Sequence, residues 1–177
     1  MIGTAYYVPA ELLINVSPLI REACLDRARP LILEGLSVQA FRVFLGWLLH
    51  RTVVEEGQVT LAKAWLFAAN YHIRPLQNAV MRKLFGLLSG DLVEPEAVSA
   101  AYQGGEDGKM LQKAFVAQIA HEMVANKSWS WGRDAVSTLG QDCHFMVDPV
   151  LAMKGAGAIE RGDLDGGSLA DVLVEES

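Results

Sequence analysis

Few cysteines, few bases and no long apolar run characterise this 177-residue sequence. The two cysteines, Cys24 and Cys143, form no CxxC pair and stand in different segments, so we interpret both as reduced thiols of an intracellular protein. The first residues, MIGTAYYVPAELL, lack a basic leader before an apolar run, which predicts no signal peptide. The run VFLGWLL between Arg42 and His50 is far shorter than the roughly 18 residues of a membrane span. We therefore expect no membrane segment.

Basic residues are also too few to favour nucleic acid as a partner. The chain has 15 Lys and Arg against 21 Asp and Glu, a net charge of -6, and no basic patch stands out. From Lys154 to the end, six acids face two bases, which accounts for four of the six net negative charges. This end is also rich in glycine. We predict that residues 155–177 form an acidic, disordered tail.

The sequence is rich in apolar residues that recur at helical spacing. Hydrophobic residues make up 51% and charged residues 20%, which suits a packed core. The segment from Phe41 to Leu88 contains three amphipathic stretches separated by short connections. In the first, after a capping Ser37, the predicted buried stripe is Val38, Phe41, Phe44, Leu45 and Leu48, with Trp47 on its flank.

The next two stretches give two further predicted helices. One begins at a capping Thr60 and buries Leu61, Ala64, Trp65, Ala68 and Ala69. The other runs from Pro75 to Leu88, with Gln77 and Asn78 away from the core. Its buried stripe is Leu76, Val80, Leu84, Leu87 and Leu88. Another long helix is predicted from Lys109 to Asn126.

Two short runs favour strands. Ala5–Val8 is aromatic and β-branched, and Leu31–Leu33 is a short apolar run between Pro30 and Glu34. Between them, Ser17 and Pro18 predict the start of a helix that carries Leu19 and Ile20. The predicted fold class is therefore α/β, mostly helical, with helices against a small sheet.

Several motifs in this order resemble a BTB/POZ domain of the fungal type. The most specific is Leu66–Asn78, LFAANYHIRPLQN, which is similar to the family signature "fAdkYxIpxLqN". Phe41–Leu48 is similar to the family helix that ends in "WLY", and Tyr7–Leu13 to its strand-to-helix segment. The likeness covers about residues 5–125, but the first strand of the family's N-terminal hairpin would precede Ala5. The resemblance then implies a bare sheet edge, a truncated hairpin or another segment in its place.

The resemblance implies a BTB/POZ-like domain over residues 1–90 and a helical extension over residues 91–154. It also implies a non-catalytic protein–protein interaction module that forms homo- or hetero-oligomers in the cytoplasm or nucleus. Family members often pair through the early helices, so Leu12, Leu13 and Ile20 are the candidate self-association residues. The same three residues could equally pack inside one subunit.

The alternative function from the same resemblance is a substrate adaptor of a cullin-type ubiquitin ligase. The candidate partner loop is then Leu25, Asp26 and Arg27, although this segment lacks the glutamate by which cullin-binding members dock. A direct pull-down of a cullin N-terminal domain distinguishes the adaptor from a self-associating module.

No constellation of catalytic or metal-binding residues is evident. Among the histidines, His121 precedes Glu122, but the second histidine of a zinc-binding HExxH motif is replaced by Ala125. Cys143 and His144 are adjacent, and neighbours on a strand point to opposite faces. We therefore predict no catalytic, cofactor-binding or metal site, and a protein as the partner.

Overall fold

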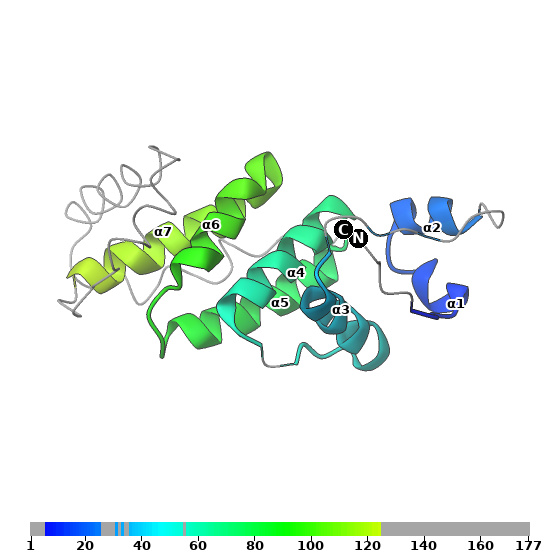
Figure 1. Ribbon diagram of the computed structural model, residues 1–177, viewed down its shortest axis with the longest axis horizontal. Coiled ribbons are helices and arrows are strands. Elements are labelled where there is room, and N and C mark those ends of the chain that lie inside the picture. Colours follow the sequence, from blue (N-terminus) through cyan, green and yellow to red (C-terminus); the bar gives the residue numbers. More distant parts are fainter. Residues whose placement is uncertain (1–5, 26–30, 32, 34–35, 55, 125–177) are drawn as a thin grey trace.

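The computed structural model describes residues 6–25, 31, 33, 36–54 and 56–124. In this part of the chain seven α-helices and one 3-10 turn follow one another (Figure 1). Their bounds are α1 Ala10–Leu13, α2 Pro18–Leu25, α3 Val38–His50, α4 Gln58–Asn70, α5 Arg74–Leu88, α6 Pro95–Gln103, η1 Gly105–Gly108 and α7 Lys109–Val124.

The predicted α/β class is wrong for the described residues, which contain helices and turns but no strand. Tyr6 to Val8 are irregular, and the described ends of the second predicted strand, Leu31 and Leu33, are irregular and half-buried. A strand exists only where its backbone groups pair with a neighbouring strand, and short apolar runs do not reveal whether one is present. Here the first run contributes ring contact instead, since Tyr6 packs on Phe41 at 4.4 Å between centroids.

Helix α3 begins where the sequence predicted. The Ser37 hydroxyl accepts a hydrogen bond from the Ala40 amide at 3.2 Å, which satisfies one of the free donors of the first turn. The helix ends at His50, and the following Arg51 adopts a left-handed conformation (φ 56°) and places its guanidinium 4.7 Å from the centre of the Trp47 ring.

Helix α4 is the centre of the fold, because it packs against α3, α5 and α6 (Figure 1). It begins at Gln58 after Gly57, two residues before the predicted cap at Thr60. Its small side chains let the neighbouring helices approach on several sides. A series of aromatic contacts crosses this region from α3 to the end of α4, joining Phe41, Phe44, Phe67 and Tyr71.

The connection between α5 and α6 is held by one buried side chain. Gln58 is only 2% exposed, and its Nε2 donates to the Leu92 carbonyl at 2.8 Å. Its Oε1 accepts from the Glu94 amide at 2.9 Å. The carboxamide thus satisfies a donor and an acceptor of the same loop, which places the start of α6 beside the start of α4.

Replacing Gln58 by leucine should lower the free energy of unfolding by about 2 kcal/mol, because the partly buried Leu92 carbonyl and Glu94 amide both lose their bond to this side chain. Urea unfolding followed by circular dichroism measures the change. The matched control is Gln103→Leu, since Gln103 is exposed and bonds only to Ser99 at 3.3 Å within its own helix. Equal losses in the two variants would show that the Gln58 bonds contribute nothing beyond an exposed amide.

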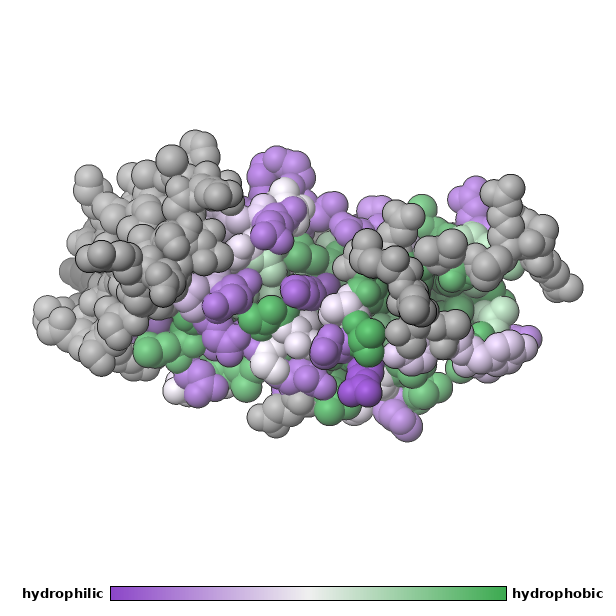
Figure 2. Space-filling model, viewed as in Figure 1, coloured by the Kyte–Doolittle hydropathy of each residue, from purple (hydrophilic) through white to green (hydrophobic). Residues whose placement is uncertain are grey.

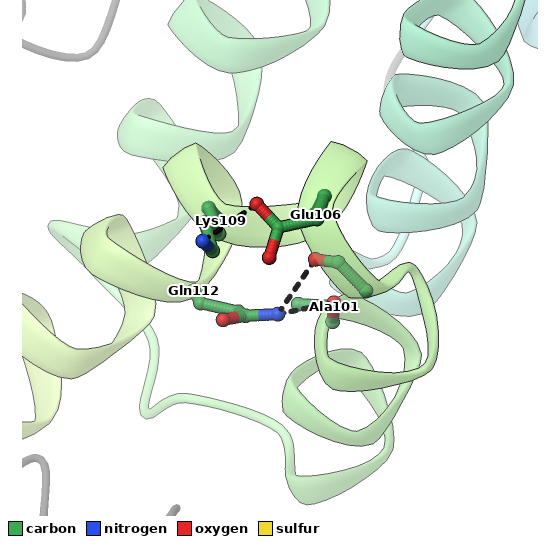
Figure 3. Close-up of polar contacts among 5 residues, drawn as sticks. Ala101, Glu106, Lys109 and Gln112 are labelled. Atoms are coloured by element: carbon green, nitrogen blue, oxygen red, sulfur yellow. Dashed lines mark hydrogen bonds and ion pairs between the residues drawn. The ribbon is translucent and has the colours of Figure 1, made fainter.

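Helices α6 and α7 meet at a tight corner formed by η1 (Figure 3). The Gln112 Nε2 donates to the Ala101 carbonyl at 3.0 Å and to the Gly105 carbonyl at 3.4 Å. Lys109 pairs with Glu106 at 2.6 Å on the exposed side of the corner. Gly108 is buried inside it. The last turn of α6 is therefore fixed against the first turns of α7.

One apolar core joins these elements, from Leu13 in α1 to Ile119 in α7. The predicted extension thus shares its core with the predicted BTB/POZ-like domain as far as α7. The last described residue is Val124, so the rest of the extension to residue 154, the acidic tail 155–177 and Cys143 lie outside the described residues.

Candidate interaction surface

The candidate site lies at the amino-terminal end of the described chain, in residues 6–25, which we call the N-terminal unit. Ser17 is 2% exposed, and its hydroxyl accepts from the amides of Leu19 at 3.1 Å and Ile20 at 3.4 Å. Proline follows it as the first residue of α2, where no amide hydrogen is needed. The sequence prediction for the start of this helix is confirmed.

A polar contact fixes α2 against the end of α1. The Arg21 Nε donates to the Ile14 carbonyl at 2.8 Å, and the Ile14 amide donates to the Ala10 carbonyl. The single-turn α1 is thereby closed at its carboxyl end by an arginine from the next helix. The two helices form a compact pair whose apolar side chains point both inward and outward.

The inward side contains two of the three predicted self-association residues. Ile20 has no exposed surface and Leu13 is 7% exposed, so both pack within this chain. Leu12, the third, is 37% exposed. The structure therefore separates the three residues, and only Leu12 is available on the surface of a single chain.

The outward side carries apolar residues that the sequence did not single out. Leu19 is 43% exposed and Tyr7 is fully exposed. Leu25, predicted as part of a partner loop, is 71% exposed, whereas Asp26 and Arg27 lie outside the described residues. With Leu12, and with Tyr6 at 44% beside Phe41, these make five exposed large apolar side chains on a unit of 20 residues. Their exposure depends on the face that each short helix turns inward, and spacing over four to eight residues cannot fix that face.

The N-terminal unit is joined to α3–α7, which we call the helical body, through Leu13 and Ile20, which belong to the same apolar core. Helices α1 and α2 pack on each other and share no comparable contact with another described helix. Figure 1 shows the pair at one end of the molecule, beyond α3. In Figure 2 green, hydrophobic surface is visible at that end among purple residues. The unit therefore presents exposed apolar side chains at one end of the molecule.

Two grooves on the helical body were not predicted from the sequence. One, of about 370 Å³, lies between the start of α4 and the α5–α6 connection and carries three carboxylates, Glu56, Asp91 and Glu94. The other, of about 360 Å³, lies between α4 and α6, with an apolar floor at Leu66 and Phe67 and an amine at Lys63. Ser37 also lines the second groove, and its hydroxyl accepts from the Ala40 amide as the cap of α3.

Metal-binding residues do not converge in the described part of the chain, where no group of three His, Cys, Asp or Glu side chains could hold an ion. His121 is exposed and Glu122 has no exposed surface, so this pair does not share a face. The Glu122 Oε1 accepts from Gln118 at 3.1 Å, and its buried Oε2 has no hydrogen-bond partner. Within the same described residues, no helix combines the length and the apolar character that crossing a bilayer requires.

Comparison with known proteins does not place this chain in a family. Searches with protein-family models, among curated proteins and among solved structures found no match to the chain. The candidate surface therefore stands on its own residues: Tyr7, Leu12, Leu19 and Leu25.

Proposed function

We propose that the protein is a non-catalytic protein–protein interaction module that self-associates through the N-terminal unit. The observation that carries this proposal is the exposure of Tyr7, Leu12, Leu19 and Leu25 on a pair of very short helices. Scattered apolar residues are normal on a surface, but several on one small projecting unit are typical of a contact site. A second copy that covers them would remove this surface from water.

The resemblance to BTB/POZ domains supports the same proposal. Its most specific motif, Leu66–Asn78, spans the end of α4 and the start of α5, where the helices pack closely. We propose that the similarity to BTB/POZ domains applies to these helices and does not extend to the sheet of that family. An intracellular setting, in the cytoplasm or nucleus, belongs to the same proposal.

The cullin adaptor stays a prediction from the resemblance. Leu25 is exposed as a docking residue must be, but it is also part of the self-association surface. No contact of the described residues favours the adaptor over self-association.

Light scattering over a range of protein concentrations tests the proposal. The wild-type chain should form a dimer, and Leu19→Glu should raise the dissociation constant by about 30-fold or more, because a charge would have to enter the apolar contact (about 2 kcal/mol). Leu12→Glu should act in the same direction. Ile20 is unsuitable as a test, since its side chain is wholly inside the chain and a charge there would disrupt the unit itself.

Val38→Glu is the matched control for Leu19→Glu. Val38 is 41% exposed, close to the 43% of Leu19, and both residues lie in the first turn of a helix that a serine caps. An acid is favourable at both positions, because it interacts with the positive end of the helix. The control should remain dimeric. Equal dissociation of both variants, or a wild-type monomer at every concentration, would contradict the proposal.

A further inference from the structure

We infer that residues 128–133 dock on the last turn of α7, where the Arg133 guanidinium pairs with the buried carboxylate of Glu122. This segment reads SWSWGR and lies outside the described residues. Its binding site is on the helical body, separate from the N-terminal unit, and both members of the pair belong to one chain. The pair is therefore expected whether or not the protein self-associates.

The carboxylate of Glu122 is buried but only half satisfied. Glu122 has no exposed surface, and its Oε1 accepts from the Gln118 Nε2 at 3.1 Å. The same nitrogen also donates to the Leu88 carbonyl at 2.9 Å, so Gln118 holds the carboxylate beside the end of α5. The buried Oε2 has no hydrogen-bond partner among the described residues. Because an unpaired buried carboxylate is costly, a base or another donor normally accompanies one.

The last turn of α7 extends past the helix on which α7 packs. Figure 1 shows α7 returning along α6, and the two helices are bonded at Gln112 and Ala101. From this bond α6 extends back only to Pro95, whereas α7 extends on to Val124, twice as far. Both helices rise by the same amount per residue. The end of α7 therefore lies beyond the start of α6.

This projecting turn is nevertheless buried, since Ile119 and Glu122 have no exposed surface. Among the described elements, α7 makes its main contacts with α6 and η1, and Gln118 adds one hydrogen bond to the end of α5. We attribute the remaining cover to the residues that follow α7. A segment that begins at residue 128, four residues after Val124, lies within about 14 Å of the helix end.

Residues 128–133 have the side chains that this place requires. Trp129 and Trp131 are large apolar side chains that can cover the last turn of α7. Arg133 supplies a positive charge with several N–H donors, one of which can reach the free Oε2. A guanidinium is more weakly hydrated than an ammonium group, so it suits a buried ion pair. The segment thus combines apolar cover with the missing donor.

A double-mutant cycle in the full chain tests the pair. Glu122→Gln and Arg133→Gln should each lower the equilibrium constant for folding by about 30-fold, because each leaves the other group without its charged partner in a buried place. Together they should cost little more than either alone, so the cycle should depart from additivity by about 30-fold. Urea unfolding followed by circular dichroism gives the four equilibrium constants.

Lys127→Gln is the matched control, because it removes the other base near the end of α7. Lys127 is five residues from Glu122, which would place it roughly 140° around a continued helix. Its effect should therefore add to that of Glu122→Gln. Additive effects of Glu122→Gln and Arg133→Gln, or coupling of Glu122 to Lys127 instead, would overturn the assignment of Arg133.

Hydrogen exchange of the unsubstituted chain, read by mass spectrometry, needs no variant to fold. The amides of residues 129–133 should exchange on the order of 100-fold more slowly than those of residues 166–170 in the predicted acidic tail, since docked segments are protected. In Glu122→Gln this protection should be lost, while residues 80–84 of α5 stay protected. Equally fast exchange of the two segments in the unsubstituted chain would show that residues 128–133 are not docked.

Discussion

Replacing Phe44 by alanine should lower the free energy of unfolding by about 3–5 kcal/mol, the range of aromatic truncations in a packed core. Phe44 has no exposed surface, and its ring lies edge-on to Phe67 of α4 at 5.1 Å and near Phe41 at 6.1 Å. Its loss would leave a cavity between α3 and α4 and break the series of aromatic contacts in the middle. Urea unfolding monitored by circular dichroism measures the difference.

Phe85→Ala is the matched control. Phe85 is also in a long helix, α5, but it is only half-buried, so its truncation leaves a smaller cavity and should cost clearly less. A similar loss at both positions would mean that the contact between α3 and α4 is not a principal source of stability. Light scattering should still find both variants in the wild-type association state, because neither residue lies on the N-terminal unit.

Replacing Gly108 by alanine should destabilise the protein by about 3 kcal/mol, the upper end of the usual cost of overpacking. A Cβ at this position would lie 2.1 Å from the carbonyl oxygen of Ala101 and 3.2 Å from its carbonyl carbon. These are backbone atoms of α6, so they cannot rotate away as a side chain could. The corner drawn in Figure 3 would have to open, which would also displace the Gln112 hydrogen bond to Ala101.

Gly86→Ala tests the same replacement where space is free. Gly86 lies within α5 and a Cβ there would meet nothing within 4 Å. Alanine should stabilise the protein by about 0.5–1 kcal/mol, because glycine loses more backbone entropy in a helix. The two variants should therefore shift the urea midpoint in opposite directions. A stabilising Gly108→Ala would show that α6 and α7 can separate at this corner without loss.

The sequence predicted the helices better than the faces that they bury. In α3 the predicted stripe contained Val38, which is exposed, and placed Trp47 on the flank, although it is 4% exposed. The observed buried set is Ala40, Val43, Phe44, Trp47 and Leu48. Both sets follow helical spacing, since almost every residue between Ala40 and Leu49 is apolar. Only the position of α4 decides between them.

Polar residues in the core were the second kind of error. Gln77 and Asn78 were predicted away from the core, yet they are 6% and 3% exposed. Gln58 was not recognised at all, because a glutamine at the start of a helix has no distinctive pattern. Its side chain stabilises the fold by hydrogen bonds to two backbone groups that lie 34 and 36 residues further along the chain. A contact of this kind is invisible until the fold brings the loop to the helix.

The predicted strands failed for a related reason, since a strand is a property of two segments and the pattern describes one. The candidate surface was predicted in part. Its place in α1 and α2 came from the resemblance, but the resemblance named Ile20 and Leu13, which pack inside the chain, and omitted Tyr7 and Leu19. On short helices, exposure depends on which neighbours cover each residue, and those neighbours are few here.

The central place of α4 has a consequence for how the chain reaches its fold. Helix α4 packs on the helix before it, on the helix after it and on α6, all close in sequence. Contacts between near neighbours require little loop closure before they form, so helical arrangements of this kind fold quickly. During synthesis, α3, α4 and α5 can therefore pack together once Leu88, the last residue of α5, has left the ribosome. The later helices would then add to a structure that already exists.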